Sequence, residues 1–200
     1  MRSSYIDNDF GEVLKQNVIC WRPINIVELG ILDGYSTIHI AEGLHELERL
    51  YGIVTHVDAY DLFEEYPYKH GRIEDIRDAL IAAELDKYVR LIPGDAFEVY
   101  KNYEDYFIDF LHVDISNTGE TIRRIMALWH PKIRERGLIF FEGGSEERDN
   151  VEWMKKYDMP PIKPEIESNP IILKHYLYGT YFKFPSMTML LHRWGNYDPQ

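Results

Sequence analysis

Short apolar runs that alternate with amphipathic stretches constrain the fold of this chain more than any other feature of its sequence. Five apolar runs are predicted as strands, at 24–29, 53–58, 89–92, 108–114 and 138–141. Between them, apolar residues recur at the spacing of an α-helix, at 35–47, 72–85 and 118–128. Strands that alternate with helices form right-handed crossovers, so the pattern predicts a mostly parallel sheet with helices on both faces.

The last third of the chain departs from this alternation. A helix is predicted near 150–156, and prolines interrupt the segment 157–178, which could cover a site. Residues 180–184 and 187–192 flank Pro185-Ser186, which is typical of an antiparallel hairpin. The sequence therefore predicts an α/β, Rossmann-like three-layer sandwich. Its sheet is expected to have seven strands, mostly parallel, and to end in an antiparallel C-terminal hairpin.

Length and charge limit the classes of partner. A chain of 200 residues is expected to form one domain, with a helical extension (1–21), a core (22–194) and a tail (195–200). Its 34 acidic and 22 basic residues give a net charge of -12, which argues against a nucleic-acid partner. The chain has no long apolar run, no signal-peptide core and one cysteine, Cys20, so we expect a cytoplasmic protein that does not bind membranes. A homo-oligomer is compatible with the sequence.

A glycine-containing loop follows the first predicted strand. It reads E-x-G-x-x-x-G from Glu28 to Gly34 and runs into the next helix. Gly30 can turn sharply because it has no Cβ, and it lets a ligand approach the backbone. Gly34 leads into a helix whose first N–H groups favour a polar or anionic group. A tight turn without a ligand remains the alternative interpretation.

Acidic residues follow the next two predicted strands. Asp58 ends the second strand, where a carboxylate can accept hydrogen bonds from ribose hydroxyls. Asp61 is a competing candidate that we assign to the following loop. After the third strand, Asp95 beside the small Ala96 could accept from an exocyclic amine and leave room for a flat base. The alternative is that Asp95 caps a short helix at 96–100.

Together these motifs resemble the class I S-adenosylmethionine-dependent methyltransferases, over roughly residues 22–194. The closest branch is the small-molecule O-methyltransferases of the catechol and macrocin type. The resemblance implies an enzyme that transfers a methyl group from S-adenosylmethionine to a small molecule, most simply to a hydroxyl. It also implies that the cofactor is bound by the loop and by the strand-end residues, namely Glu28, Gly30, Gly34, Asp58, Asp95 and Ala96.

Two related functions fit the sequence less well. A nicotinamide-binding domain needs G-x-G-x-x-G, but Leu32 stands between Gly30 and Gly34. Enzymes that methylate amines in nucleic acids resemble one another in an [N/D]-P-P-[Y/F] segment, whereas residues 114–117 read Asp-Ile-Ser-Asn. A cofactor-binding scaffold or sensor without catalysis remains open.

The candidate residues for binding and activating the methyl acceptor are Asp114 and Glu142, which end the fourth and fifth predicted strands. Their carboxylates are expected to share a cleft, where two hard oxygens could bind Mg²⁺ or Ca²⁺. The metal-dependent branch resembles this arrangement, but with Asp-Asn where this chain has Glu142-Gly143, and with a lysine where it has Asn117. The alternative is that neither carboxylate binds a metal: one of the two caps a helix, and the other accepts hydrogen bonds from loop amides.

We predict Asp114, Glu142 and His112 as catalytic residues, with Asp114 and Glu142 as the pair that could hold a metal. His112 lies within the fourth strand, from which it could orient Asp114 or act as a base. The eight histidines of the chain show no metal-ligand spacing.

Overall fold

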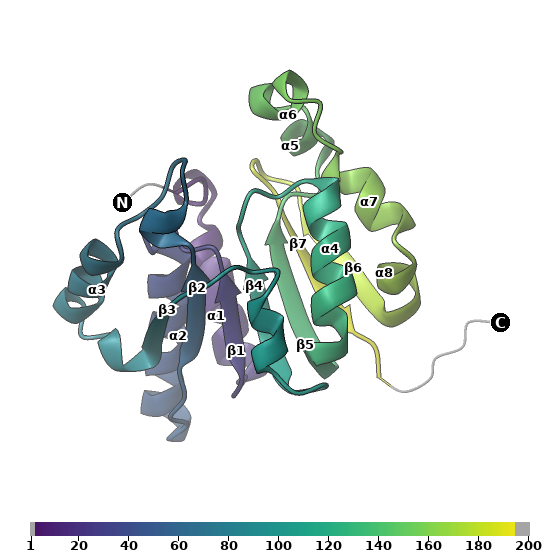
Figure 1. Cartoon of the computed structure of the whole chain (residues 1–200). Helices are drawn as coiled ribbons and strands as arrows, with labels where there is room; N and C mark the ends of the chain where they lie inside the picture. The colour runs from purple at the N-terminus through teal and green to yellow at the C-terminus, as the bar shows by residue number, and fades with distance from the viewer. Residues whose placement is uncertain (1–2, 195–200) are drawn as a thin grey trace. The chain divides into compact units, whose positions relative to one another are not determined.

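Strands and the helices that connect them make up both halves of the chain in the computed structural model, which describes residues 3–194 (Figure 1). Its contacts separate two units, unit 1 (Met1–Glu98) and unit 2 (Val99–Gln200). Unit 1 contains η1 (Ile6–Asn8), α1 (Phe10–Trp21), β1 (Ile26–Leu29), α2 (Tyr35–Tyr51), β2 (Val57–Asp61), η2 (Phe63–Glu65), α3 (Ile73–Ala82), η3 (Asp86–Tyr88) and β3 (Val89–Pro93). Unit 2 contains η4 (Val99–Asn102), β4 (Ile108–Val113), α4 (Gly119–Trp129), η5 (His130–Lys132), β5 (Ile133–Glu142), α5 (Glu146–Asp149), α6 (Glu152–Lys156), α7 (Ile162–Ser168), α8 (Pro170–His175), β6 (Tyr176–Tyr181) and β7 (Met187–His192).

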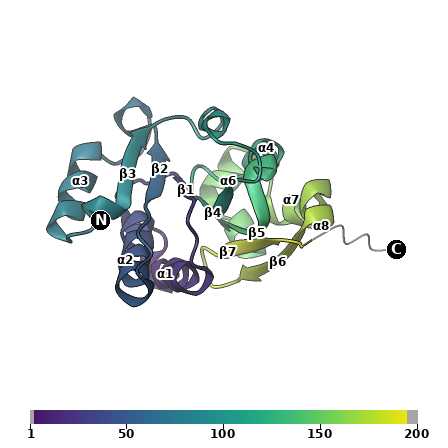
Figure 2. The ribbon, with the colours of Figure 1, turned by 90° about the horizontal axis from the view of Figure 1, so that it is seen from below.

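The strands of unit 1 are parallel, in the order β3-β2-β1. Every residue of β1 is buried, as expected of a parallel strand that is covered on both faces. Helices α1 and α2 pack side by side, and α3 lies on the side of β3 (Figure 2). Helix α1 lies within the segment 1–21 for which the sequence predicts a helical extension.

The strands of unit 2 follow the order β4-β5-β7-β6. Strand β4 runs parallel to β5, whereas β7 is antiparallel to both β5 and β6. All six residues of β4 are buried, and Phe110 stacks on Phe140 of β5 with ring centroids 5.1 Å apart. Helices α4, α7 and α8 contact one another (Figures 1 and 2). The strand order over the chain, β3-β2-β1-β4-β5-β7-β6, confirms the predicted mostly parallel sheet of seven strands with an antiparallel hairpin.

Three strands begin four or five residues from their predicted starts; one of them is β6, which spans Tyr176–Tyr181 and not 180–184. Strand β2 begins at Val57 and not at Ile53, because the apolar Val54 is 74% exposed and belongs to the preceding loop. Strand β5 begins at Ile133, five residues before the predicted start. Residues 134–136, near the start of this strand, are polar and exposed, so an apolar run does not mark them as strand in the sequence.

The segment 157–178 folds into α7 and α8 and enters β6. Two of its prolines stand where a helix begins and a missing N–H costs nothing: Pro161 is the N-cap residue of α7 and Pro170 is the first residue of α8. The side chain of Asn169 accepts the N–H groups of Ile171 and Ile172 and so caps α8. The predicted tail, 195–200, lies outside the described residues. No helix within residues 3–194 combines the length and apolar character needed to cross a membrane.

Helix α4 depends on its N-cap, and this gives a first prediction. The hydroxyl of Thr118 accepts the backbone N–H of Thr121 at 3.1 Å. Thr118→Ala should lower the free energy of unfolding by about 1 kcal/mol, because the N–H of Thr121 loses its acceptor. Thr118→Ser, which keeps the hydroxyl, should lose only a fraction of this. Urea denaturation followed by circular dichroism measures both, and equal losses in the two variants would contradict the capping role.

Candidate active site

The glycine loop of unit 1 is a tight turn built from left-handed residues. Gly30, Leu32 and Gly34 have φ values of 90°, 51° and 85°. Side chains disfavour this region of φ, so glycine suits both ends of the loop. The N–H of Gly30 donates to the carbonyl of Tyr60 at 2.8 Å, and the N–H of Gly34 to that of Ile31 at 2.9 Å. The loop therefore adopts the sharp turn that the sequence predicts.

Asp61 holds this loop to the end of β2. Its Oδ2 accepts the N–H groups of Ile31 at 2.7 Å and Leu32 at 3.2 Å, while its Oδ1 accepts the N–H of Phe63 at 2.8 Å. Asp61 is the last residue of β2, so it occupies the strand end that the sequence analysis gave to Asp58.

The placement of Asp58 at a strand end is wrong. Asp58 is the second residue of β2, opposite Arg90 in the register with β3. Its Oδ1 accepts from Nε of Arg90 at 2.6 Å, and Nε2 of His56 lies 3.6 Å away. The error follows from the shifted start of β2, which moves the carboxyl end of the strand three residues further along the chain.

Helix α2 begins directly after the loop, with Gly34 as its N-cap residue and no side chain capping it. The first-turn N–H groups of such a helix attract negative charge. In the same turn Thr37 is fully buried, and its hydroxyl has no hydrogen-bond partner within the described part of the chain. This end of α2 can therefore bind an anionic or polar group.

Gly71 packs against the glycine loop from the segment that precedes α3. A Cβ at Gly71 would lie 1.6 Å from the carbonyl oxygen of Leu32, so no side chain fits there. The sequence analysis did not single out Gly71, because its contact with residue 32 arises only in the folded chain.

The remaining predicted cofactor residues lie on β1 and after β3. Glu28 is fully buried within β1. Asp95 is exposed, and its Oδ1 accepts the N–H of Phe97 at 2.8 Å, so it caps a turn; the alternative helix at 96–100 is wrong, because η4 begins only at Val99. Ala96 is buried beside it. Their contact with a cofactor stays a prediction.

Unit 2 places Asp114 directly after β4, half-buried at the carboxyl end of the strand. His112 lies two residues earlier and is fully buried opposite Phe140. Complete burial does not suit a base that contacts an acceptor, so the structure favours a supporting role for His112 and leaves Asp114 as the residue at the strand end.

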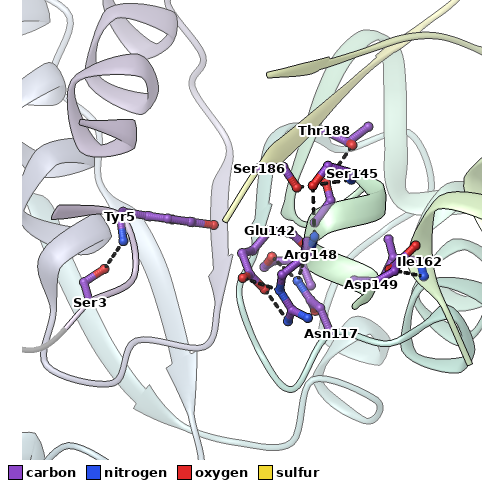
Figure 3. Close-up of polar contacts among 12 residues, drawn as sticks. Ser3, Tyr5, Asn117, Glu142, Ser145, Arg148, Asp149, Ile162, Ser186 and Thr188 are labelled. Carbon is purple, nitrogen blue, oxygen red and sulfur yellow. Dashed lines mark hydrogen bonds and ion pairs between the residues drawn. The ribbon is translucent and has the colours of Figure 1, made fainter. Parts of the chain in front are cut away.

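Glu142 ends β5, and both of its carboxylate oxygens bind Arg148 of α5 (Figure 3). Nε and Nη2 of Arg148 donate to Oε1 and Oε2 at 2.6 and 2.8 Å, and both side chains are buried. Burial by itself would lower the pKa of Arg148, but hydrogen bonds to Glu142 and its charge outweigh burial and raise the pKa above its usual value. The guanidinium therefore stays charged.

This ion pair corrects the predicted metal site. A divalent cation bound by Asp114 and Glu142 would compete with a guanidinium that already occupies both oxygens of Glu142 and whose charge also acts on Asp114. The donor set does not fit a metal. Glu142 is thus a partner of Arg148, and its predicted role in catalysis is not supported by its contacts.

Asn117 joins the ends of β4 and β5. Its Nδ2 donates to the carbonyl oxygens of Val113 at 3.1 Å and Glu142 at 3.0 Å. The side chain is fully buried, and its Oδ1 has no partner within the described residues. In the resemblance to the metal-dependent branch, a lysine stands at the position of Asn117. Here the Asn117 amide instead hydrogen-bonds the backbone carbonyls at the ends of β4 and β5.

Helix α7 begins against this edge. A Cβ at Gly143, which has a φ of 113°, would lie 2.5 Å from Cδ1 of Ile162. The carboxylate of Asp149 accepts the N–H groups of Ile162 and Lys163 at 2.7 and 2.8 Å (Figure 3). The segment 157–178 therefore does lie over the loop that follows Glu142.

Comparison with known proteins places the chain in a family. A family model described as a methyltransferase domain matches residues 27–142, more than half of the chain. The chain belongs to this methyltransferase family. The match includes both the glycine loop and the strand ends at Asp114 and Glu142. Comparison with curated proteins finds no match.

Solved structures share the fold of this methyltransferase. An O-methyltransferase from Bacillus cereus in complex with SAH is 17% identical, with a TM-score of 0.64 over 96% of this chain and 84% of its own. The O-methyltransferase TomG from Streptomyces achromogenes in complex with SAM is 13% identical, with a TM-score of 0.65 over 93% and 80%. A methyltransferase from Geobacter sulfurreducens is 14% identical, with a TM-score of 0.67 over 94% and 80%. These likenesses confirm the Rossmann-like fold.

The buried ion pair gives the second prediction. Arg148→Met leaves the carboxylate of Glu142 buried without its cation and should lower the free energy of unfolding of the methyltransferase by about 3–5 kcal/mol. The double variant with Glu142→Leu should recover most of this loss, because no charge then remains buried. Thermal and urea denaturation measure both variants.

The exposed pair of Arg77 and Glu74, also 2.6 Å apart, is the control. Arg77→Met should leave the free energy of unfolding almost unchanged, since solvent screens this pair. Similar losses from Arg148→Met and Arg77→Met would contradict the structural role of the buried pair.

Proposed function

We propose that this protein transfers the methyl group of S-adenosylmethionine to a hydroxyl group of a small molecule. The observation that carries the proposal is the glycine loop of unit 1, with three left-handed residues, held by Asp61 and leading into an uncapped α2, in a chain of the methyltransferase family. Two neighbours in fold are described as complexes with SAM or SAH, which supports the same cofactor here.

Each cofactor group has a candidate partner in unit 1. The loop at Gly30 lets the cofactor approach the backbone, and the start of α2 with the buried hydroxyl of Thr37 suits a carboxylate. The strand-end position of Asp61 makes it our candidate for the ribose hydroxyls, in place of Asp58. Asp95 and Ala96 remain candidates for the adenine side. Leu32 keeps a side chain where a dinucleotide pyrophosphate needs glycine, which disfavours NAD.

The acceptor step is assigned to Asp114. In this reaction the hydroxyl oxygen attacks the methyl carbon as the carbon–sulfur bond breaks, and the bonding electron pair stays on sulfur as the neutral thioether. The hydroxyl proton passes to the carboxylate of Asp114, which acts as general base. The net charge of -12 favours a small acceptor over a nucleic acid, whose phosphates it would repel.

A binding protein without catalysis is the second candidate. The contact of Glu142 with Arg148 favours it, because it removes one of the two carboxylates that the sequence analysis gave to catalysis. The two candidates share the cofactor site and differ in turnover, so binding and catalysis are tested separately.

The third prediction concerns the cofactor. Asp61→Asn should weaken binding of SAH by about 10-fold or more, since hydrogen bonds to a charged group contribute roughly 1.5–3 kcal/mol. Gly30→Val should abolish binding, because valine disfavours a φ of 90°. Isothermal titration calorimetry measures SAH, SAM and NAD, and NAD should not bind.

Asp58→Asn is the matched control, because Asp58 pairs with Arg90 along the sheet. Its affinity for SAH should stay within a few fold of the wild type. A loss in Asp58→Asn with none in Asp61→Asn would return the ribose role to Asp58. Binding of NAD without binding of SAM or SAH would overturn the proposed function.

The fourth prediction concerns the reaction. Asp114→Asn keeps the shape of the side chain but removes its charge, so SAH affinity should stay within a few fold while methyl transfer falls by about 10²–10⁴. Formation of SAH from SAM is measured over a panel of phenols, catechols and aliphatic alcohols. Asp105→Asn, which alters an exposed carboxylate of unit 2, should leave turnover unchanged.

Full turnover in Asp114→Asn would show that Asp114 is not the base. A wild-type protein that binds SAM but forms no SAH with any acceptor of the panel would favour the non-catalytic alternative.

A further inference from the structure

Three histidines from distant parts of the sequence come together in unit 2. His130 begins η5, His175 ends α8 and His192 ends β7. One ring nitrogen from each lies within 4.8 Å of the other two. The ring centroid of His130 lies 4.5 Å from that of His175 and 5.5 Å from that of His192. We propose that His130, His175 and His192 form a binding site for Zn²⁺.

Hydrogen bonds orient two of the rings for ligation. Nδ1 of His192 lies 3.0 Å from the carbonyl oxygen of Arg134, which can only accept. Nδ1 therefore carries the proton, and Nε2 holds the lone pair that a metal needs. Nδ1 of His130 lies 3.0 Å from the hydroxyl of Tyr176, whose oxygen can accept in the same way. Partners of this kind on the second nitrogen are usual for histidines that bind metals.

Burial disfavours the protonated form of two of the three rings. Burial, followed by the charges of the neighbouring histidines, lowers the pKa of His130 to about 4. Burial also lowers the pKa of His175, with contributions from Lys174 and His192. Burial raises the pKa of Tyr176 far above 10, so its hydroxyl stays neutral. Burial thus disfavours the protonated forms of His130 and His175, which could not bind a cation.

The ligand set favours zinc over the hard cations. Mg²⁺ and Ca²⁺ prefer oxygen, whereas three imidazole nitrogens with a water in the fourth position form a common tetrahedral zinc site. Zinc–nitrogen bonds of about 2.0–2.1 Å place tetrahedral ligands roughly 3.3 Å apart. The ring nitrogens lie up to 4.8 Å apart, so each distance between them has to shorten by at most about 1.5 Å when zinc binds. Small ring rotations at the ends of η5, α8 and β7 can supply this.

The site lies far from the proposed chemistry. His130 precedes the first residue of β5, and Glu142 is the last of its ten residues. At about 3.3 Å per residue, the strand separates the two ends by roughly 30 Å. A zinc ion here would not take part in methyl transfer. It would tie the β6–β7 hairpin and the end of α8 to the start of β5, which makes its expected role structural.

Untagged protein, stripped with a chelator and dialysed, tests the proposal by titration with Zn²⁺. We expect one bound ion per chain in calorimetry and a higher Tm on addition of Zn²⁺. Co²⁺ in place of Zn²⁺ should give the visible absorption bands of a tetrahedral nitrogen site. These readouts do not depend on methyltransferase activity, so the proposal can fail or hold independently of the proposed function.

His175→Ala is the decisive variant. The ring of His175 makes no hydrogen bond within the described residues, so its removal takes away a ligand with little effect on folding. We expect loss of stoichiometric Zn²⁺ binding, of the Tm increase and of the Co²⁺ bands. His45→Ala is the control, since this exposed histidine of unit 1 contacts Tyr88 outside the cluster, and it should behave as the wild type. No binding by the wild type, or equal binding by His175→Ala, would overturn the proposal.

Discussion

The carboxyl ends of buried parallel strands pose the constraint on which the rest of this structure depends. Where such a strand stops, the backbone N–H and carbonyl groups of the following loop still need partners. In unit 1 the carboxylate of Asp61 accepts two N–H groups of the glycine loop. In unit 2 the amide of Asn117 donates to the last carbonyls of both β4 and β5. Polar side chains at the strand ends thus hold the backbone of the following loops in place, whether or not a ligand is bound.

This constraint bears on the roles of the acidic residues at the strand ends. A carboxylate at a strand end can be a ligand-binding group, a structural acceptor or both, and only its contacts decide. Asp61 combines a structural contact with a position suited to ribose, whereas Glu142 is committed to Arg148. Asp114 follows the last residue of β4, half-buried at the carboxyl end of the strand, and is the residue to which we assign the acceptor step. The candidate active site has one carboxylate on its acceptor side where the sequence suggested two.

Unit 2 has a different polar cluster at each end of β5. At the carboxyl end, Glu142 and Arg148 form a charged pair that burial strengthens. At the other end, burial keeps His130 neutral beside His175 and His192. The same physical effect, the removal of water, strengthens the ion pair at one end and lowers the pKa of His130 and His175 at the other. Both clusters join segments that lie far apart in the chain or on separate elements.

The sequence by itself determined the order and type of the main elements, because apolar periodicity is a local property. It predicted the parallel strands, the glycine loop with its two left-handed glycines, and the antiparallel hairpin. It misplaced the start of β2, because Ile53-Val54 is apolar yet lies outside the strand, and Asp58 was therefore taken for the strand end. Only the tertiary structure decided which charges pair and which histidines meet. Glu142 and Arg148 are on different elements, and His130, His175 and His192 are separated by 45 and 17 residues, so no local spacing could reveal contacts that packing creates.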